Sequence, residues 1–254
     1  MSKGWTARVD TLLHYYSSQL PPYTRTFVSL PEVRSASPTG LVPILTVRSL
    51  SHNQELQIAD TLAISEFLAE HNPNLPLWPQ DPCLRAMARS IVAQMHSGFH
   101  ELRNTFHTNF VAKYEGPIPM SEKSLDEIQR LFKMWSTARR ETVKQLFNDP
   151  DADGVRDEGF LFGPFGIADA FFWPVLWRFR TYNLPLSGAP EEVLQWMNTM
   201  WEDPKLKELG NEYFEQAKHP ETRTEKYEDI FKDIEGVKFD QVEADWKFIS
   251  GESI

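Results

Sequence analysis

Two short stretches of this sequence could together hold a small peptide-like ligand. Gly40-Leu41-Val42-Pro43 leads into an apolar run through a Val-Pro step, and Asp60-Thr61 places an acid and a hydroxyl before an apolar-periodic stretch. Because proline has no N–H, Pro43 suits the entry of a strand, and this step suits a cis peptide. A strand entry can bind an extended peptide through its backbone, and a helix N-terminus can bind a carboxylate. The two stretches therefore predict a cradle for a small, acidic, peptide-like ligand.

A second group of polar side chains follows the cradle. His96, His100, Arg103 and His107 are spaced at i, i+4, i+7 and i+11, which places them on one face of a single helix. Imidazole and guanidinium groups on such a face could bind an anionic or phenolic substrate. The His-x-x-x-His spacing could also ligate a metal, but no third ligand accompanies it, so no metal site is predicted. A polar face in solvent or at a dimer interface is the alternative interpretation.

Hydrophobic periodicity predicts the elements that position these residues. In the first part of the chain we expect a helix, three strands and a second helix, at Trp5–Leu20, Thr24–Leu30, Leu41–Arg48, Glu55–Ile58 and Asp60–Glu70. Repeated prolines from Pro73 to Pro82 then predict an extended linker and a domain boundary. Five helices are expected after it, at Leu84–Phe110, Ser121–Phe147, Ile167–Tyr182, Glu191–Trp201 and Lys205–Lys218. The predicted division is 1–72, a linker 73–83, a helical domain 84–218, and a polar extension 219–254 that packs over the surface.

Composition narrows the class of protein. The chain has 254 residues, 41% of them hydrophobic, and a net charge of −10. That charge argues against nucleic acids and anionic membranes as partners, and no apolar run approaches the roughly 20 residues that span a bilayer. A single cysteine, Cys83, excludes an internal disulfide, and the first residues lack an apolar signal region. We expect a cytoplasmic protein.

The cradle stretches resemble the glutathione-binding half of the cytosolic glutathione transferase superfamily. Its pattern is Gly-x-Val-Pro followed by Glu or Asp and Ser or Thr at a helix start. The run Phe165-Gly166-Ile167-Ala168-Asp169 resembles the capping box of the family's buried C-terminal helix, in which Asp169 reaches back to the Gly166 N–H. The resemblance covers about residues 5–218. It implies an α/β thioredoxin-like N-terminal domain, with its first strand missing, and an all-helical C-terminal domain.

In relatives, a strand inside the sheet precedes the first helix, whereas only Met1 stands before Ser2 here. We expect that the sequence begins late, because deleting an interior strand exposes two unpaired backbone edges.

The resemblance also implies a role for each matching cradle residue. Asp60 would take the ammonium of the γ-glutamyl group of glutathione, and the hydroxyl and N–H of Thr61 would take its carboxylate. Val42 would bind the cysteinyl part through its backbone, while Pro43 shapes the strand entry. An ordinary helix N-cap is the alternative interpretation of Asp60 and Thr61.

Family members place a Ser, Tyr or Cys before the first helix, where it stabilises the glutathione thiolate. Counting back from Arg8, this position falls on Lys3, with Ser2 one residue away. Ser2 is therefore the candidate catalytic residue, and Lys3 is assigned to the glutathione site. The acceptor pocket implied by the resemblance takes side chains from the polar helix face, namely His96, His100, Arg103 and His107.

The implied reaction is attack of the glutathione thiolate on a small apolar electrophile, in detoxification or secondary metabolism. Glutathione is then the cosubstrate, and the family is usually dimeric. Two alternatives remain at this point. One is a glutathione-dependent isomerase, lyase or reductase in a biosynthetic pathway, and the other is a non-catalytic binding protein with the same fold.

Overall fold

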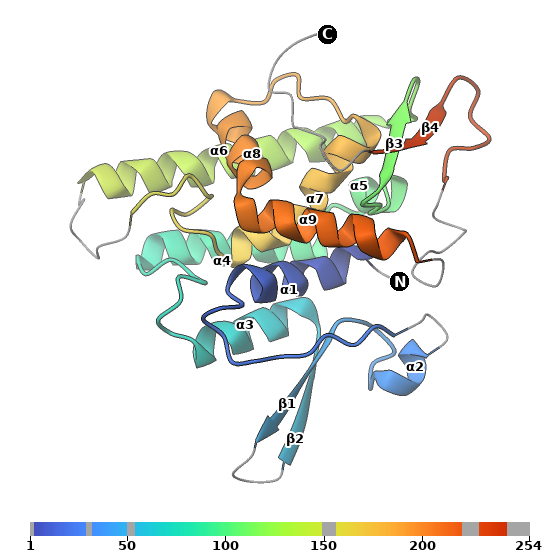
Figure 1. The fold of residues 1–254 in the computed structure, drawn as a ribbon. Coiled ribbons are helices and arrows are strands. Elements are labelled where there is room, and N and C mark those ends of the chain that lie inside the picture. Colours follow the sequence, from blue (N-terminus) through green and yellow to red (C-terminus); the bar gives the residue numbers. More distant parts are fainter. Residues whose placement is uncertain (1–2, 29–31, 50–53, 149–155, 220–228, 243–254) are drawn as a thin grey trace.

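The computed structural model describes residues 3–28, 32–49, 54–148, 156–219 and 229–242 (Figure 1). Its first part contains the helices α1 (Lys3–Tyr15), α2 (Val33–Ala36) and α3 (Thr61–His71), with the strands β1 (Ile44–Ser49) and β2 (Gln54–Ala59) between α2 and α3. The later helices are α4 (Pro82–Ser97), α5 (His100–Thr105), α6 (Glu122–Asn148), α7 (Ile167–Tyr182), α8 (Glu191–Glu202) and α9 (Pro204–Ala217). The expected change from mixed to mainly helical structure after α3 is therefore present.

The first sheet is an antiparallel hairpin of β1 and β2 that extends away from α3 in Figure 1. Its register pairs Ile44 with Ala59, so the residues just before β1 lie at the same end of the hairpin as the residues that open α3. Leu45 and Ile58 face each other in the pairing and pack against the core. The hairpin thus brings the two cradle stretches together.

The predicted strand over Thr24–Leu30 is wrong where the structure describes it, since residues 21–28 have no regular secondary structure. The Arg25 guanidinium instead donates to Asp10 of α1 (3.1 Å) and to Glu212 of α9 (2.6 Å). A β-prone run forms a strand only with a neighbour to pair with. Anchoring to two helices holds this segment in another way.

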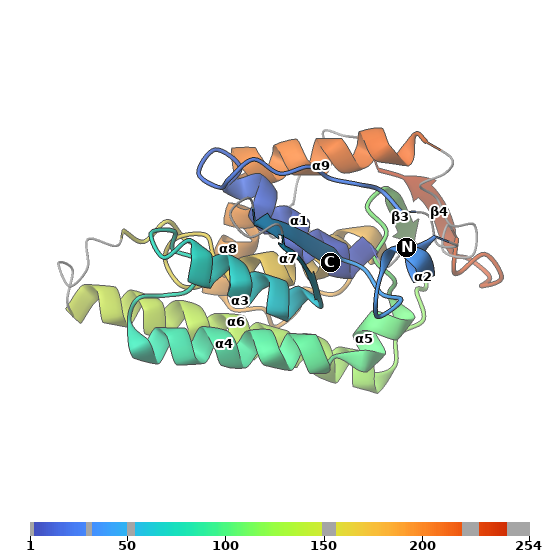
Figure 2. The same cartoon turned by 90° about the horizontal axis from the view of Figure 1, so that it is seen from below.

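The helix α7 is the centre of the molecule, and every one of its residues is buried. It covers the expected range, and it packs against α1 and α4, which lie beside it in both views (Figures 1 and 2). The expected capping box is also present, because Asp169 Oδ2 accepts the Gly166 N–H at 3.1 Å. The same carboxylate accepts N–H groups of Leu161 and Trp196 through Oδ1, both at 2.9 Å.

The single helix predicted over Leu84–Phe110 is wrong. The chain breaks at Gly98, which is extended, and at Phe99, which has a left-handed backbone with φ of 56°. Glycine favours such a break because it is a poor helix former, and burial of the Phe99 ring holds the turn. Glu127 of α6 then accepts the Leu102 N–H at 2.7 Å and so caps the new helix α5.

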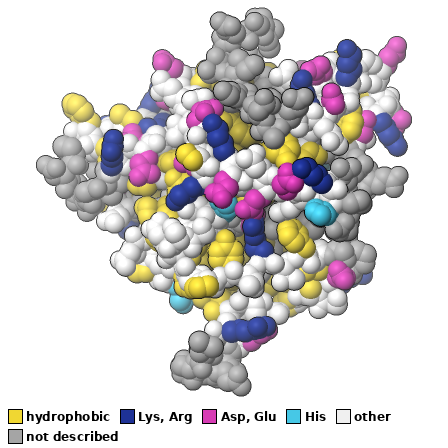
Figure 3. Space-filling model, viewed as in Figure 1, with side chains coloured by type: hydrophobic (Ala, Val, Ile, Leu, Met, Phe, Trp, Pro, Cys, Tyr) yellow, Lys and Arg dark blue, Asp and Glu magenta, His cyan; other side chains and the backbone are white. Residues whose placement is uncertain are grey.

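The described part of the C-terminal extension packs on the helical part, and it contributes a strand that the sequence analysis did not predict. The strand β4 (Lys238–Gln241) pairs antiparallel with β3 (Ala112–Glu115). Phe231 is buried against the rings of Tyr114 and Tyr182. On the face shown in Figure 3, acidic and basic side chains are interspersed and do not form a large patch of one sign.

Candidate functional site

The loop before β1 is held by one buried side chain. The Ser37 hydroxyl donates to the Leu41 carbonyl (2.7 Å) and accepts the Leu41 N–H (3.1 Å). Gly40 has φ of 68°, a left-handed conformation that favours glycine, and the Val42-Pro43 peptide is cis, as the Val-Pro step suggested. Val42 and Pro43 are half-buried, immediately before the strand. The position of Val42 and Pro43 is therefore set by interactions within this loop.

Asp60, at the N-terminus of α3, lies at the same end of the hairpin as this loop. Its Oδ1 accepts the N–H groups of Leu62 (2.8 Å) and Ala63 (3.3 Å), so it is the N-cap of the helix. Its Oδ2 lies 3.2 Å from His96 Nε2, and about half of the Asp60 side chain is exposed. The capping role that was the alternative interpretation of Asp60 is thus present, while about half of the side chain remains exposed.

Thr61 has a different environment. Its side chain is 1% exposed, and its Oγ1 has no hydrogen-bond partner among the described residues. A buried hydroxyl without a partner is unfavourable by about 1–3 kcal/mol. The hydroxyl must turn outward to contact a ligand, whereas the first N–H groups of a helix have no partner within the helix and point toward its N-terminal end.

An aromatic and cationic cluster adjoins Asp60. Trp5 of α1 packs edge-on against His96 with ring centroids 5.1 Å apart. The guanidinium groups of Arg8 and Arg103 lie 4.3 Å and 4.5 Å from the Trp5 ring centroid. The ends of α1, α3, α4 and α5 therefore converge at one point, with an indole at its centre.

Three arginines of this region influence one another. Arg8 is 3% exposed, and its Nε and Nη1 atoms have no hydrogen-bond partner within the described structure. Burial, followed by repulsion from Arg103 and Arg178, holds the pKa of Arg8 well below its usual value. Burial also lowers the pKa of Arg178 to about 10, and it donates to the carbonyls of Phe106 and Pro174, both at 2.7 Å. Buried cations are normally paired with anions. Asp60 acts on Arg8 and Glu127 acts on Arg103 in the direction that raises the pKa, so the three guanidinium groups of this arginine cluster (Arg8, Arg103, Arg178) face two carboxylates.

The structure brings some of the predicted site residues together and separates others. Asp60, His96 and Arg103 meet around Trp5. The helix break turns His100 to an exposed position at the start of α5, while His107 lies beyond α5, where its carbonyl accepts the Tyr182 hydroxyl at 2.7 Å. The prediction that these side chains share one helix face is therefore wrong.

The structure describes no side chain for two of the predicted site residues. Ser2 lies outside the described residues, and for Lys3 only the backbone at the start of α1 is described. Their proposed roles stay predictions.

Sequence reasoning missed the arginine cluster as a unit. The available signal was a charged residue in an otherwise apolar pattern, as with Arg178 inside the fully buried α7. The spacing of Trp5 and Arg8 at i and i+3 was a further signal, because it places both side chains on one helix face.

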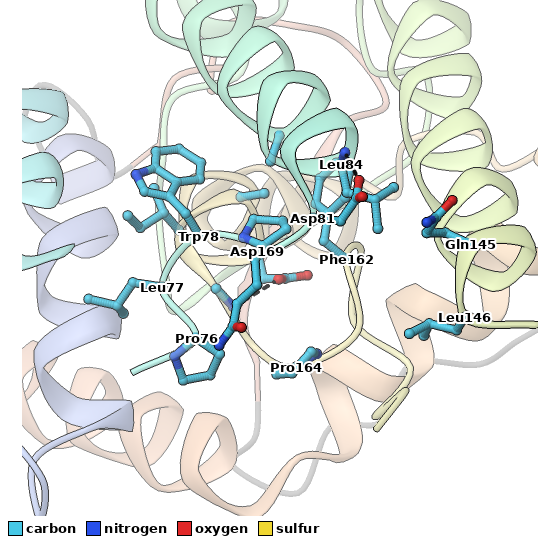
Figure 4. Close-up of a pocket in the computed structure, with 16 residues that line it drawn as sticks. Pro76, Leu77, Trp78, Asp81, Leu84, Gln145, Leu146, Phe162, Pro164 and Asp169 are labelled. Carbon is cyan, nitrogen blue, oxygen red and sulfur yellow. Dashed lines mark hydrogen bonds between the residues drawn. The ribbon is translucent and has the colours of Figure 1, made fainter. Parts of the chain in front are cut away.

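A separate cavity of about 90 Å³ lies between the 76–81 segment and the start of α7 (Figure 4). Pro76 and Leu77 lie on one side of it, and Gln145 and Leu146 of α6 lie on the other. Burial raises the pKa of Asp169, at the wall of this cavity, to about 6, against the effect of its three N–H donors. The cavity shares no lining residue with the Asp60 site, and Asp169 is fully engaged in holding α7.

The segments that the structure describes contain no grouping of three His, Cys, Asp or Glu side chains arranged to hold a metal ion. Nor does any helix in these segments have the length and apolar character to cross a membrane.

Comparison with known proteins relates this arrangement to a family. Residues 121–201 match the family described as glutathione S-transferase, C-terminal domain. A probable maleylacetoacetate isomerase of Caenorhabditis elegans is 47% identical over 133 residues, which cover 52% of this chain and 56% of the relative. A maleylacetoacetate isomerase of Pseudomonas aeruginosa is 26% identical over 161 residues, covering 63% of this chain and 66% of the relative. The chain thus spans less than two thirds of the length of either relative.

Among solved structures, Ure2p in complex with S-hexylglutathione aligns with a TM-score of 0.58 and 18% identity, covering 82% of this chain and 95% of the other. The chain therefore has the fold of the glutathione transferase superfamily, which confirms the resemblance seen in the sequence. It combines a thioredoxin-like α/β part with a glutathione S-transferase C-terminal helical domain.

Proposed function

We propose that this protein binds glutathione between the Val42-Pro43 strand entry and the N-terminus of α3. Its thiolate then attacks a small apolar electrophile, so that a thioether of glutathione forms and the leaving group of the electrophile departs. The observation that carries the proposal is the β1–β2 register. By pairing Ile44 with Ala59, it sets a cis-proline loop beside an exposed carboxylate at a helix N-terminus. The superfamily fold and the glutathione analogue bound by Ure2p support the same ligand.

The residues present fit glutathione. The Asp60 side chain is half-exposed, and its Oδ2 can accept the γ-glutamyl ammonium because only Oδ1 is needed to cap α3. The N-terminal end of α3 suits the adjacent carboxylate. The backbone of Val42 can pair with the cysteinyl part, as a neighbouring strand would.

The thiol of the bound tripeptide would lie toward the start of α1. We assign its activation to the Ser2 hydroxyl, with Lys3 beside it. A hydroxyl or ammonium group near the sulfur lowers the thiol pKa from about 8.5 and raises the thiolate fraction at neutral pH. Trp5 and the half-buried Arg103 then border the space for the electrophile.

Direct tests of this function are retention on immobilised glutathione and conjugation of a chlorinated nitroarene, followed by the absorbance of the thioether product. We expect both, with the thiolate absorbance of bound glutathione detectable near neutral pH. Binding without thiolate absorbance or conjugation would instead support a non-catalytic binding protein. The absence of any binding would overturn the proposal.

A glutathione-dependent isomerase is the second candidate, and the arginine cluster favours it. Both curated relatives are maleylacetoacetate isomerases by name, and an organic acid of this kind would supply the anion that buried arginines require. Thiolate addition to a double bond, rotation and release of the thiolate would return glutathione unchanged. Turnover of an unsaturated acid without a stable conjugate would distinguish this reaction from transfer.

Substitution of Arg8 tests whether the arginine cluster serves to bind an anion or to stabilise the fold. We expect Arg8→Met to leave the free energy of unfolding unchanged or to raise it by about 1–2 kcal/mol, because a buried cation without a hydrogen-bonded anion is replaced by an apolar side chain. Urea denaturation measures this. Arg139→Met is the control, since Arg139 pairs with Asp157 at 2.9 Å and its removal should destabilise. An equal loss of stability in both variants would contradict the functional interpretation.

The remaining assignments follow from this proposal. Residues 1–72 would form the glutathione-binding domain and 84–218 the acceptor-binding domain, with 73–83 as linker and 219–254 as extension. We further propose a homodimer that acts in the cytoplasm, in detoxification or secondary metabolism. The exposed, unpaired thiol of Cys83 is compatible with a reducing compartment.

A further inference from the structure

His96 of α4 contacts the carboxylate oxygen of Asp60 that would accept the ammonium group of glutathione. Its Nε2 is 3.2 Å from Asp60 Oδ2, while Asp60 Oδ1 is engaged by the first turn of α3. The imidazole ring of His96 also packs against the edge-on ring of Trp5. The ammonium of a ligand must therefore share or displace this contact.

The surroundings of His96 favour the neutral imidazole. Its Nδ1 is buried and has no partner among the described residues, which suits a nitrogen without a proton better than a buried N–H without an acceptor. Burial lowers the pKa of His96, Asp60 opposes this shift, and Arg8 and Arg103 add to it. In the neutral form, His96 brings no charge to its 3.2 Å contact with Asp60, so an incoming ammonium can replace this contact.

Protonation of His96 changes the competition between His96 and the ligand ammonium for Asp60. An imidazolium forms a charge-assisted bond with Asp60, which is about twice as strong as a neutral one. It also repels the ammonium of the ligand. We propose that His96 is a positioning residue. It contacts Asp60 in the free protein and is displaced from it when the γ-glutamyl ammonium binds, so that the charge of His96 determines the affinity for glutathione. This inference rests on the proposed function.

The charged groups that act on His96 come from α1, α3 and α5, while α7 contributes the uncharged Phe171 ring. Asp60 belongs to the start of α3, Arg8 to α1 and Arg103 to α5, and Arg103 also donates to the His96 carbonyl at 3.2 Å. Among the side-chain types of this set, histidine is the one whose charge ordinarily changes between about pH 5 and pH 7, and glutathione keeps its own charge over this range.

The test is calorimetric titration of glutathione into the whole protein between about pH 5 and pH 7.5. In the wild type we expect the dissociation constant to rise as the pH falls, by up to about tenfold per pH unit once His96 is protonated in the free protein. His96→Gln keeps a neutral N–H donor that does not titrate, so its dissociation constant should vary by less than about twofold over the same range. The matched control is His71→Gln, at the opposite end of α3, which should behave like the wild type.

A second measurement needs no ligand. In the NMR titration of the imidazole protons, Asp60→Asn should lower the pKa of His96, because it removes the negative charge that favours the imidazolium. Parallel pH profiles in the wild type and His96→Gln, with binding still weakened in Asp60→Asn, would overturn this inference and leave the proposed function standing. No glutathione binding at any pH would overturn the proposed function together with this inference.

Discussion

Replacing Asp60 with asparagine should weaken glutathione binding by about ten- to a hundredfold, since a charge-assisted hydrogen bond to the ammonium is worth roughly 1.5–3 kcal/mol. Asparagine is as good an N-cap as aspartate, and it tolerates the positive φ of 83° at this position. Its Oδ1 can still accept the Leu62 and Ala63 N–H groups that Asp60 accepts now. The variant thus removes the charge and keeps the helix start, and calorimetric titration at neutral pH measures the result.

Asp81 offers a matched control. It is the N-cap of α4, where its Oδ1 accepts the Leu84 N–H at 2.7 Å, and it takes no part in the cradle. Asp81→Asn should leave the affinity for glutathione unchanged. Alanine at either position should cost about 1 kcal/mol of unfolding free energy through the lost cap. Unchanged affinity in Asp60→Asn would remove Asp60 from the glutathione site.

The local geometry of the two cradle stretches could be predicted from sequence because its determinants are local. The cis Val42-Pro43 step and the N-cap at Asp60 are decided by residue types over two or three positions, and both are present in the structure. The capping box of Asp169 is likewise a local pattern with fixed spacing. Such features depend little on the rest of the chain, so one sequence is enough to propose them.

The acceptor side was predicted less well because it depends on distant contacts. A helix period assigned His100 and His107 to one face with His96, but the left-handed Phe99 ends the helix between them. That break is stabilised by Phe99 burial and by Glu127 of α6, neither of which is visible in a local window. The contact of Arg8 with Phe171 of α7 also joins residues from distant parts of the chain.

Removing the Asp169 carboxylate should have the largest effect on stability, about 3–5 kcal/mol in the free energy of unfolding. The side chain is 1% exposed and accepts the N–H groups of Leu161, Gly166 and Trp196 at 2.9, 3.1 and 2.9 Å. Asp169→Ala leaves all three donors buried without an acceptor, at the start of the helix on which α1 and α4 pack. Urea denaturation followed by tryptophan fluorescence measures the loss.

Asp203→Ala is the matched control for this prediction. Asp203 caps α9 by accepting the Lys205 and Leu206 N–H groups at 2.9 and 3.0 Å, but it is only partly buried, so water can replace it. Its removal should cost about 1 kcal/mol. Because solvent access separates the two caps, equal losses in both variants would mean that the buried donors around Asp169 find other acceptors when the carboxylate is removed. In that case α7 would be held by the packing of its apolar surface and not by its capping box.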